Sequence, residues 1–360
     1  MYRDSNNDGD PAAVVGTVSG TSISFGSPVY ISTDQAKTTP MGCTFDSSSN
    51  KIVISWVASY NSDYGTAVVG TVSGTSISFG SAVVFRSAAI RDISSTFDST
   101  NNKVVISYGD DSDSDNGKAV VGTVSGTSIT FGSEATFDSG DIHDISSAFD
   151  STLGKVVISY RDFDDSFNGN SVVGTVSGTS ITFGTAVTFN ASNTQYTKTS
   201  YNAASQKIVI SFRDAGDSNK GKFVEGTVSG SSISFGSATT FTADVDVYIA
   251  SAYDSNSNTV VISYSDNGNS DYGTSLVVRS AYDVTNLTSE NYIGMSQGGS
   301  VASGSSATVD IIGSLSTNQS GLTAGQSYFV QTDGTIDTTP ATPEVFAGTA
   351  ISATSLVVKT

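Results

Sequence analysis

The sequence has 360 residues, only 14% of them charged, and its 34 acidic against 16 basic residues give a formal net charge of -18. Such a surface repels a phosphate backbone, because nucleic-acid binding depends on Lys and Arg contacts, so we expect no nucleic-acid partner. A single cysteine, Cys43, and a single histidine, His143, exclude an internal disulfide and a four-thiolate metal site. No apolar run is long enough to predict membrane insertion, and the first residues show no secretory signal pattern.

Three sequence markers recur through most of the chain in steps of 52 residues, with one step of 54 between Gly16 and Gly70. The first is an aromatic residue followed by Asp or Asn, at Phe45-Asp46, Phe97-Asp98, Phe149-Asp150, Tyr201-Asn202 and Tyr253-Asp254. The second is the first glycine of V-G-T-V-S-G, at Gly16, Gly70, Gly122, Gly174 and Gly226. The third is I-S-aromatic, which ends at Trp56, Tyr108, Tyr160, Phe212 and Tyr264. Repetition of this kind indicates one structural unit used several times.

Each repeat predicts four short strands, which in the second complete unit cover residues 92–98, 103–108, 119–125 and 127–133. β-Branched and aromatic residues alternate along these runs, and no segment has a useful helical period. We expect the glycine in the third strand to mark the close approach of a neighbouring sheet. The pattern predicts an all-β fold, a repeat β-propeller of about five four-stranded blades. We expect residues 12–27 to complete the fifth blade, with six blades as the alternative and a β-solenoid as the rival fold.

The period ends near residue 283, which predicts a propeller over residues 1–283 and a small β domain over residues 284–360. The second part contains N-Y-I-G, T-V-D-I-I-G and S-G-L-T-A-G-Q-S-Y-F-V-Q-T-D-G, at residues 291–294, 308–313 and 320–334, and a last run at 343–358. These runs resemble a C-terminal module of tail-fibre-like structural proteins from tailed bacteriophages, especially marine ones. The resemblance implies a virion tail appendage, commonly a homotrimer, that touches the host surface, and it implies no catalytic residue.

The residues that lead into the first strand of each unit differ between repeats, while their surroundings do not. We expect them to lie in crossover loops that converge on one face of the propeller. Arg, His, Asp, Gln and Tyr side chains there suit sugar hydroxyls through hydrogen bonds and ring stacking. The alternative is neutral drift in exposed loops. The predicted ligand-binding residues are Arg91, Asp92, His143, Asp144, Gln195, Tyr196 and Tyr248.

An acidic loop follows the second strand of each unit and is a candidate calcium site, because alternating carboxylates and a turn glycine suit that ion. The segment D-S-N-N-D-G near the start matches the first half of a calcium loop, but Val15 stands where the bidentate glutamate belongs. Solvated turn residues are the alternative interpretation. The predicted metal ligands are Asp4, Asp8, Asp111, Asp113 and Asp115.

Catalysis has weaker support in the sequence than ligand binding. Asp92 and Asp144 could form the carboxylate pair of a glycosidase, but carboxylates are abundant here, and His143 lacks a nucleophile at a recognisable spacing. We expect Trp56 in the core and Cys43 as a buried small side chain. The sequence therefore predicts a non-enzymatic tail-fibre-like protein that binds a bacterial surface glycan or receptor. A bacterial extracellular adhesin or lectin-like propeller, a structural virion spacer and a glycan-cleaving tailspike are the alternatives.

Overall fold

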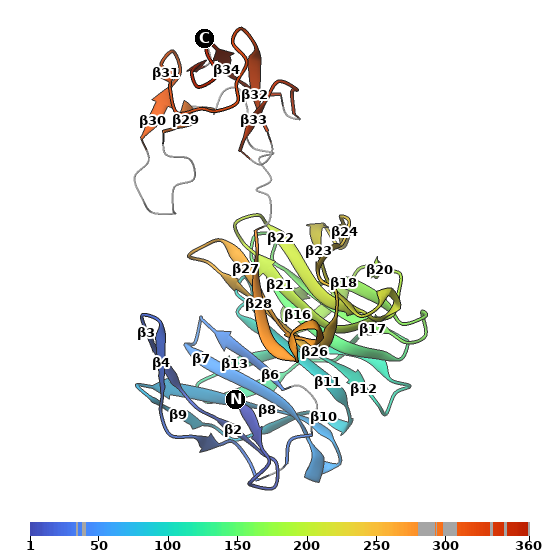
Figure 1. Ribbon diagram of the computed structural model, residues 1–360. Coiled ribbons are helices and arrows are strands. Elements are labelled where there is room, and N and C mark those ends of the chain that lie inside the picture. The colour runs from blue at the N-terminus through green and yellow to red at the C-terminus, as the bar shows by residue number, and fades with distance from the viewer. Residues whose placement is uncertain are drawn as a thin grey trace. The chain divides into compact units, whose positions relative to one another are not determined.

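The computed structural model describes residues 1–33, 35–37, 41–279, 292, 294–297, 308–331, 334–341 and 344–358 (Figure 1). The chain divides into two compact units. The first comprises Met1–Tyr253 and Val260–Val278, and the second comprises Asp254–Thr259 and Arg279–Thr360. The domain boundary expected between residues 283 and 284 lies outside the described residues. Within the described residues, no helix is long and apolar enough to span a membrane.

The first unit contains four complete blades, and the all-β propeller fold is confirmed. In the second of these blades the strands are β11 (Arg91–Asp98), β12 (Lys103–Asp110), β13 (Asn116–Ser125), β14 (Ser128–Phe131) and β15 (Ala135–Asp138). All pairs are antiparallel in the order β11-β12-β13-β14, and β15 also pairs with β13, so the fourth strand consists of two pieces. The third strand is long because it pairs with both pieces.

The other three complete blades repeat this arrangement. The first contains β6 (Gly42–Asp46), β7 (Lys51–Ala58), β8 (Tyr64–Ser73), β9 (Ser76–Phe79) and β10 (Val83–Ala89). The third contains β16 (Ile142–Asp150), β17 (Lys155–Asp162), β18 (Asn168–Ser177), β19 (Ser180–Phe183) and β20 (Val187–Asn190). The fourth contains β21 (Thr194–Asn202), β22 (Lys207–Asp214), β23 (Lys220–Ser229), β24 (Ser232–Phe235) and β25 (Thr239–Thr242). Short 3-10 turns occur at η1 (Ser59–Asn61), η2 (Ala215–Asp217) and η3 (Asn267–Asn269).

Two incomplete sheets flank the four blades. One contains β1 (Tyr2–Asp4), β2 (Asp10–Ala13) and β5 (Val29–Tyr30), next to a hairpin of β3 (Gly16–Ser19) and β4 (Ser22–Phe25). The other contains β26 (Val245–Asp254), β27 (Thr259–Asp266) and β28 (Tyr272–Val278). We expected residues 12–27 to complete the sheet of β26–β28. Within the described residues the N-terminal strands pair with one another instead.

The core lies between successive blades and is built from the alternating residues of the second and third strands. One cluster joins Val105 and Val121 of the second complete blade to Ile158 and Val172 of the next. Trp56, Tyr108, Tyr160 and Phe212 are all 0% exposed, which confirms the expectation that Trp56 belongs to the core. The Tyr160 hydroxyl donates to Asp138 Oδ2 at 2.6 Å, so the ring is buried without leaving its polar end unpaired.

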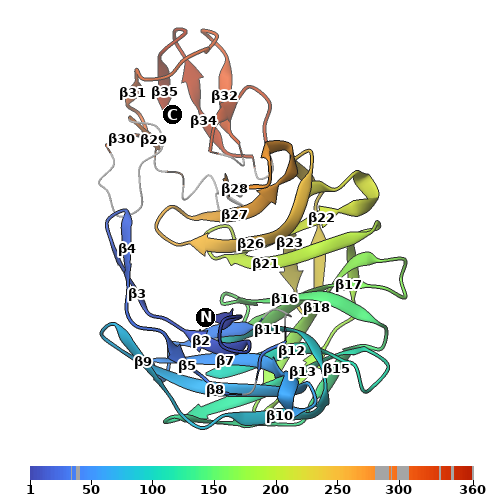
Figure 2. The ribbon, with the colours of Figure 1, turned by 60° about the horizontal axis from the view of Figure 1, so that its bottom comes forward.

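Serine and threonine residues connect the first strands of neighbouring blades. The hydroxyls of Ser94 and Ser147 lie 2.9 Å apart, and the Thr199 backbone N–H donates to Ser146 Oγ at 2.9 Å. Figure 2 shows β11, β16, β21 and β26 following one another in this order. Because these strands lie innermost, side chains from several blades reach one another along them.

The aromatic-Asp marker of the repeat closes the turn between the first two strands. The Asp98 side chain accepts from the backbone N–H of Thr100 and of Asn101, both at 2.9 Å. Asn202 accepts in the same way from Ala204 and Ser205. These bonds satisfy backbone donors beside a buried side chain, which explains why the sequence requires Asp or Asn here.

We expect Asp98→Ala to lower the free energy of unfolding by about 1–2 kcal/mol, because two backbone donors lose their acceptor. Asp98→Asn should retain most of the stability, since Asn202 supplies the same amide oxygen in its own blade. Urea unfolding of the three proteins, followed by circular dichroism, measures the difference. Equal stability of the wild type and Asp98→Ala would show that the turn does not depend on this side chain.

Two kinds of glycine allow close packing, one within a blade and the other between successive blades. A Cβ on Gly122 would meet the side chains of Ile129 and Phe131 in the same blade, so our expectation that a neighbouring sheet approaches this glycine is wrong. A Cβ on Gly132 would instead overlap the backbone oxygen of Thr179 in the following blade. Gly26, Gly80 and Gly184 meet the following sheet in the same way. The glycine of F-G-S or F-G-T is therefore the position at which the backbone of the following sheet packs closely against this one.

The expectation that Cys43 is buried is wrong, because its side chain is exposed. The neighbouring Phe45 on β6 is also 51% exposed. The N-terminal sheet has no strand equivalent to β11 within the described residues, so no first strand covers this face of β6. Burial at this position depends on a neighbouring blade rather than on the repeat itself.

The second unit is a small β domain. It contains a two-stranded sheet of β29 (Gly294–Ser296) and β30 (Val309–Ile311). Its five-stranded sheet has the order β31 (Leu315–Ser316), β35 (Leu356–Val358), β34 (Phe346–Ala350), β32 (Ser327–Val330) and β33 (Ile336–Asp337). Tyr292, Tyr328, Val345 and Leu356 are buried together in its core. The motifs that carry the phage resemblance thus supply strands and core residues here.

Candidate functional site

The diverging residues of the repeats occupy one position in the first strand of successive blades. Asp92, Asp144, Tyr196 and Tyr248 all have left-handed φ angles, between 45° and 55°. Strand pairing is interrupted around the first three of them, which is the signature of a β-bulge. We expected these residues in crossover loops; they lie inside the strands instead. The bulge turns each of these side chains away from the regular alternation of the strand.

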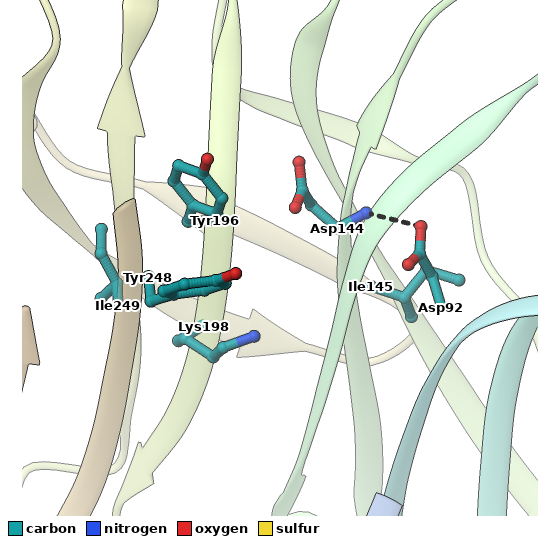
Figure 3. A pocket seen from close by; sticks show the side chains of 7 residues that line it. All are labelled: Asp92, Asp144, Ile145, Tyr196, Lys198, Tyr248 and Ile249. Carbon is teal, nitrogen blue, oxygen red and sulfur yellow. Dashed lines mark hydrogen bonds between the residues drawn. The ribbon is translucent and has the colours of Figure 1, made fainter. Parts of the chain in front are cut away.

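These bulges surround a cavity of about 160 Å³, which we call the first-strand pocket (Figure 3). It is lined by Asp92, Asp144, Ile145, Tyr196, Lys198, Tyr248 and Ile249. Four of the seven predicted ligand-binding residues therefore line one pocket, and the other three, Arg91, His143 and Gln195, do not. Lys198 and the two isoleucines were not predicted from the sequence. Lys198 could have been selected from the sequence, because it is a charged residue where the other repeats have the small residues Ser94, Ser146 and Ala250.

The two carboxylates of the pocket are connected through the backbone. The Asp144 backbone N–H donates to Asp92 Oδ2 at 3.3 Å, as Figure 3 shows. Burial, followed by the charge of Asp92, raises the pKa of Asp144, while Arg161 and Lys198 act in the opposite direction. The nearby Tyr196 backbone N–H also favours the charged form of Asp144. Asp144 is therefore a poorly solvated acceptor that gains from a hydroxyl donor in the pocket.

Lys198 brings a positive charge to the same pocket. Burial lowers the pKa of its ammonium group, whereas the charges of Asp144 and Asp92 oppose that effect. Within the described part of the chain, the Lys198 ammonium group makes neither a hydrogen bond nor an ion pair. Figure 3 shows its side chain below the Tyr248 ring, with the nitrogen directed toward the side of the pocket that holds Ile145 and Asp92.

The two tyrosines form the aromatic wall of the pocket. Their ring centroids lie 5.8 Å apart, and Tyr248 is 76% exposed. A bulky residue in the left-handed region is unfavourable by roughly 1 kcal/mol or more, whereas the Asp residues of the preceding repeats adopt it more easily. The blades of Tyr196 and Tyr248 therefore accept a less favoured residue at this position, and the result is a ring surface open to a ligand.

The remaining predicted ligand residues form a polar row beside the pocket. His143 Nδ1 lies 3.3 Å from Asp92 Oδ2, and His143 Nε2 lies 3.2 Å from Asp141 Oδ1. Arg91 pairs with Asp141 and also with Asp115, at 2.9 Å. These side chains are already engaged with carboxylates, so they hold Asp92 and its surroundings in place rather than line the cavity.

Gln195 is also engaged outside the cavity, because its Oε1 accepts from Arg213 NH1 at 3.0 Å. The Arg213 guanidinium lies 5.9 Å from the centroid of the Tyr196 ring. Gln195 thus positions an arginine against the aromatic wall of the pocket.

The acidic loops have structural roles. An aspartate ends the second strand of every repeat except the one with Ala58, and it accepts from backbone N–H groups of its own loop, as in the bond from Asp164 N–H to Asp162 at 3.0 Å. The aspartates with this role are Asp4, Asp110, Asp162, Asp214 and Asp266. This arrangement closes a tight turn without a metal ion.

The predicted calcium ligands do not converge. Asp111 and Asp115 pair with Arg91 at 3.3 and 2.9 Å, and Asp113 pairs with Lys118 at 2.7 Å. Asp4 accepts from the Tyr30 hydroxyl, and Asp8 lies exposed in its turn. Among the residues that the structure describes, no group of three acidic, histidine or cysteine side chains is arranged to hold a metal ion. The calcium prediction has no support here because the carboxylates have basic or hydroxyl partners.

The raised pKa of Asp144 predicts a specific dependence of stability on pH. The folded state holds the proton more tightly than the unfolded state, so ionisation of Asp144 costs stability as the pH rises through its raised pKa. Asp144→Asn fixes the neutral form. We expect this variant to be more stable than the wild type at pH 7, with the difference disappearing below pH about 4, the ordinary pKa of aspartate.

Thermal unfolding between pH 3 and pH 8 measures this difference. Asp254→Asn is the control of opposite sign, because hydrogen bonds from Ser257 and from the Asn256 backbone lower the pKa of Asp254. That variant should lose stability at neutral pH. An Asp144→Asn protein that is less stable than the wild type at pH 7 would show that the Asp144 charge is stabilising.

No family model and no curated protein matches this sequence. Among solved structures, the chain is similar to a crystal structure of an exo-β-1,3-galactanase variant from Phanerochaete chrysosporium with β-1,3-galactotriose. The identity is 11% and the TM-score is 0.43, and the match covers 70% of this chain and 60% of that chain. This chain thus spans less than two thirds of the enzyme that it matches. At this level of similarity, no family and no activity follow from the match.

Proposed function

We propose that this protein is a tail-fibre-like attachment protein of a tailed bacteriophage and that it binds a bacterial surface glycan in the first-strand pocket without cleaving it. The C-terminal resemblance supports the assignment to a virion, where the protein would belong to a tail appendage and form a homotrimer. The binding role depends on a separate observation. One structural position holds Asp in two successive repeats and Tyr in the next two, and all four of these residues line one pocket.

The pocket chemistry suits a sugar. Asp144 and Asp92 offer carboxylate oxygens to hydroxyl donors, Lys198 offers a donor, and the tyrosine rings offer apolar faces for a pyranose ring. The rigid strands limit the ordering cost of binding. A cavity of about 160 Å³ supports only a small contact, so firm attachment would require several copies to act together.

Binding without hydrolysis is the better-supported proposal. A glycosidase needs two carboxylates free to flank the scissile bond, one as an acid and one as a base or nucleophile. One oxygen of Asp92 already accepts from the Asp144 backbone, and His143 lies beside the same oxygen. Asp92 therefore has one oxygen committed to the bulge and only the other free for a ligand. A glycan-cleaving tailspike would reveal itself by the release of reducing ends from host polysaccharide.

A bacterial extracellular adhesin or lectin-like protein would use the same pocket, and a structural virion spacer would not use it. Diversified residues at the bulge favour a binding role over a spacer, because a spacer gains nothing from tyrosines in a strained conformation. The C-terminal resemblance favours a virion over a bacterial surface.

The test is binding of the labelled full chain to a broad array of bacterial glycans, with and without a calcium chelator. We expect saturable binding that the chelator does not change, because the acidic loops pair with Arg91 and Lys118. Reducing-end release from the bound glycans should equal that of a protein-free blank. Absence of binding by the folded protein would overturn the proposal in favour of a spacer, and release of reducing ends would favour a hydrolase.

A further inference from the structure

Several basic side chains of this acidic chain pair with carboxylates, but three that lie at or beside the first-strand pocket do not. Arg86, Arg91, Lys118 and Lys222 each pair with at least two acidic side chains. With 34 acidic residues against 16 basic ones, such pairing is expected. Lys198, Arg161 and Arg213 have no carboxylate within ion-pair distance among the described residues, and, unlike Lys155, they lie at or beside the pocket.

Of these three cations, Lys198 alone lines the pocket. Its charge interacts at longer range with Asp144 and Asp92. Neither carboxylate lies within ion-pair distance of the ammonium group. A poorly solvated ammonium without a partner is costly, and an anion that enters the pocket would remove that cost.

Arg161 is the second cation, and its charge also interacts with Asp144. It lies 4.4 Å from the centroid of the Phe163 ring and donates from NH2 to Asn193 Oδ1 at 2.9 Å. Its Nε is buried without a hydrogen-bond partner, and burial lowers the pKa of the guanidinium. The Phe163 ring and the Asn193 amide hold this guanidinium in place, but neither of them neutralises its positive charge.

Arg213 occupies the position equivalent to Arg161 in the next blade. It donates to Gln195 and lies over the Tyr196 ring, and its Nε is also buried without a partner. The other repeats have Val57, Gly109 and Ser265 at this position, and Arg3 of the N-terminal sheet, which also matches it, donates instead to the Ala36 carbonyl. The two arginines therefore belong to the two blades that contribute Asp144, Tyr196 and Lys198 to the pocket.

We propose that the bound glycan carries one anionic group, a carboxylate or a phosphate on a sugar ring, and that Lys198 and Arg161 recognise it. This inference rests on the proposed function. The hydroxyls of the same sugar would donate to Asp144. A net charge of -18 repels an extended polyanion, so the anionic group is an isolated one seated at the pocket. Guanidinium and ammonium groups bind both anions, so their chemistry alone leaves the two open.

The test uses the full chain on three copies of one bacterial-glycan array. The first copy is untreated, the second has its carboxylates reduced to alcohols, and the third is dephosphorylated with hydrofluoric acid. We expect binding on the untreated copy to fall at least tenfold on one treated copy. Loss on the second copy assigns a carboxylate, and loss on the third assigns a phosphate. Unchanged binding on all three copies overturns this inference and leaves the proposed function standing, whereas no binding on the untreated copy overturns both.

Three variants connect the anion preference to the pocket. Lys198→Gln and Arg161→Gln should each weaken binding to the acidic glycan about tenfold or more, the usual effect of losing a charged hydrogen bond. Lys198→Arg should keep the preference for the untreated glycan, which a purely structural role would not require. Lys155→Gln is the control, because that ammonium donates to the Thr175 hydroxyl outside the pocket. Equal binding by Lys198→Gln, Lys155→Gln and the wild type would contradict the proposal.

Discussion

Gly132→Ala is expected to lower the free energy of unfolding by about 3 kcal/mol, the upper part of the usual range for overpacking. A Cβ at this position overlaps the backbone oxygen of Thr179 in the next blade, and backbone cannot move aside as a flexible side chain can. The φ angle of Gly132 is not left-handed, so the effect is one of space rather than of backbone strain. Urea unfolding of the purified variant measures it.

Gly236→Ala is the matched control, because Gly236 occupies the same place in its repeat. Nothing among the described residues lies within 4 Å of the Cβ that it would gain. We expect its stability to stay within about 0.5 kcal/mol of the wild type. If both variants unfold at the wild-type urea concentration, the blades do not pack through this glycine, and the inter-blade contact described above is wrong.

Tyr248→Ala is expected to weaken glycan binding about tenfold or more without a measurable change in stability. The ring is 76% exposed, so its removal leaves no core cavity, but it takes away the most accessible stacking surface of the pocket. Alanine also carries a Cβ, so the cost of the left-handed φ at this position remains and does not change stability. Titration calorimetry with the glycan identified on the array, together with thermal unfolding, separates the two effects.

The control for Tyr248→Ala is Tyr272→Ala. Tyr272 is 67% exposed at the start of β28 and does not line the pocket. Its removal should leave affinity unchanged. Equal losses of affinity in both variants would indicate a diffuse aromatic surface, and no loss in either would remove the tyrosines from the proposed binding site.

The repeated strands were predictable because the interactions that form them are local. Alternation and turn residues predicted the second strand as residues 103–108, and the structure has it at Lys103–Asp110. The role of residues 12–27 was not predictable in the same way, because pairing between distant strands leaves no periodic signal. The exposure of Cys43 depends likewise on a neighbouring sheet. The sequence therefore predicted the strands within a repeat, but it did not predict the pairing and burial that depend on contacts between repeats.

The candidate site was predicted in part, because the period aligned the residues that differ. Asp92, Asp144, Tyr196 and Tyr248 were selected by that alignment and line one pocket. The β-bulge that turns them inward was not visible, because a left-handed φ at Asp or Tyr leaves no sequence signature. Lys198 lies two residues after the bulge and was read as part of a strand.

The role of the acidic loops could not be decided from the sequence, for a physical reason. Alternating aspartates suit both a calcium loop and a turn closed by side-chain acceptors, and the sequence does not show where their partners lie. Arg91 belongs to a different segment from Asp111 and Asp115, yet it pairs with both. Only the folded arrangement reveals that these carboxylates already have a cation.

Photoaffinity labelling with the array-identified glycan tests the central claim most directly. A photoreactive derivative would be cross-linked to the full chain, and the labelled peptides would be identified by mass spectrometry. The first-strand pocket predicts label on peptides that contain Asp144, Tyr196 to Lys198, and Tyr248, from three successive sheets, with competition by the unmodified glycan. Competable label confined to the loop around Asp113, or to residues 308–358, would show that the glycan binds elsewhere.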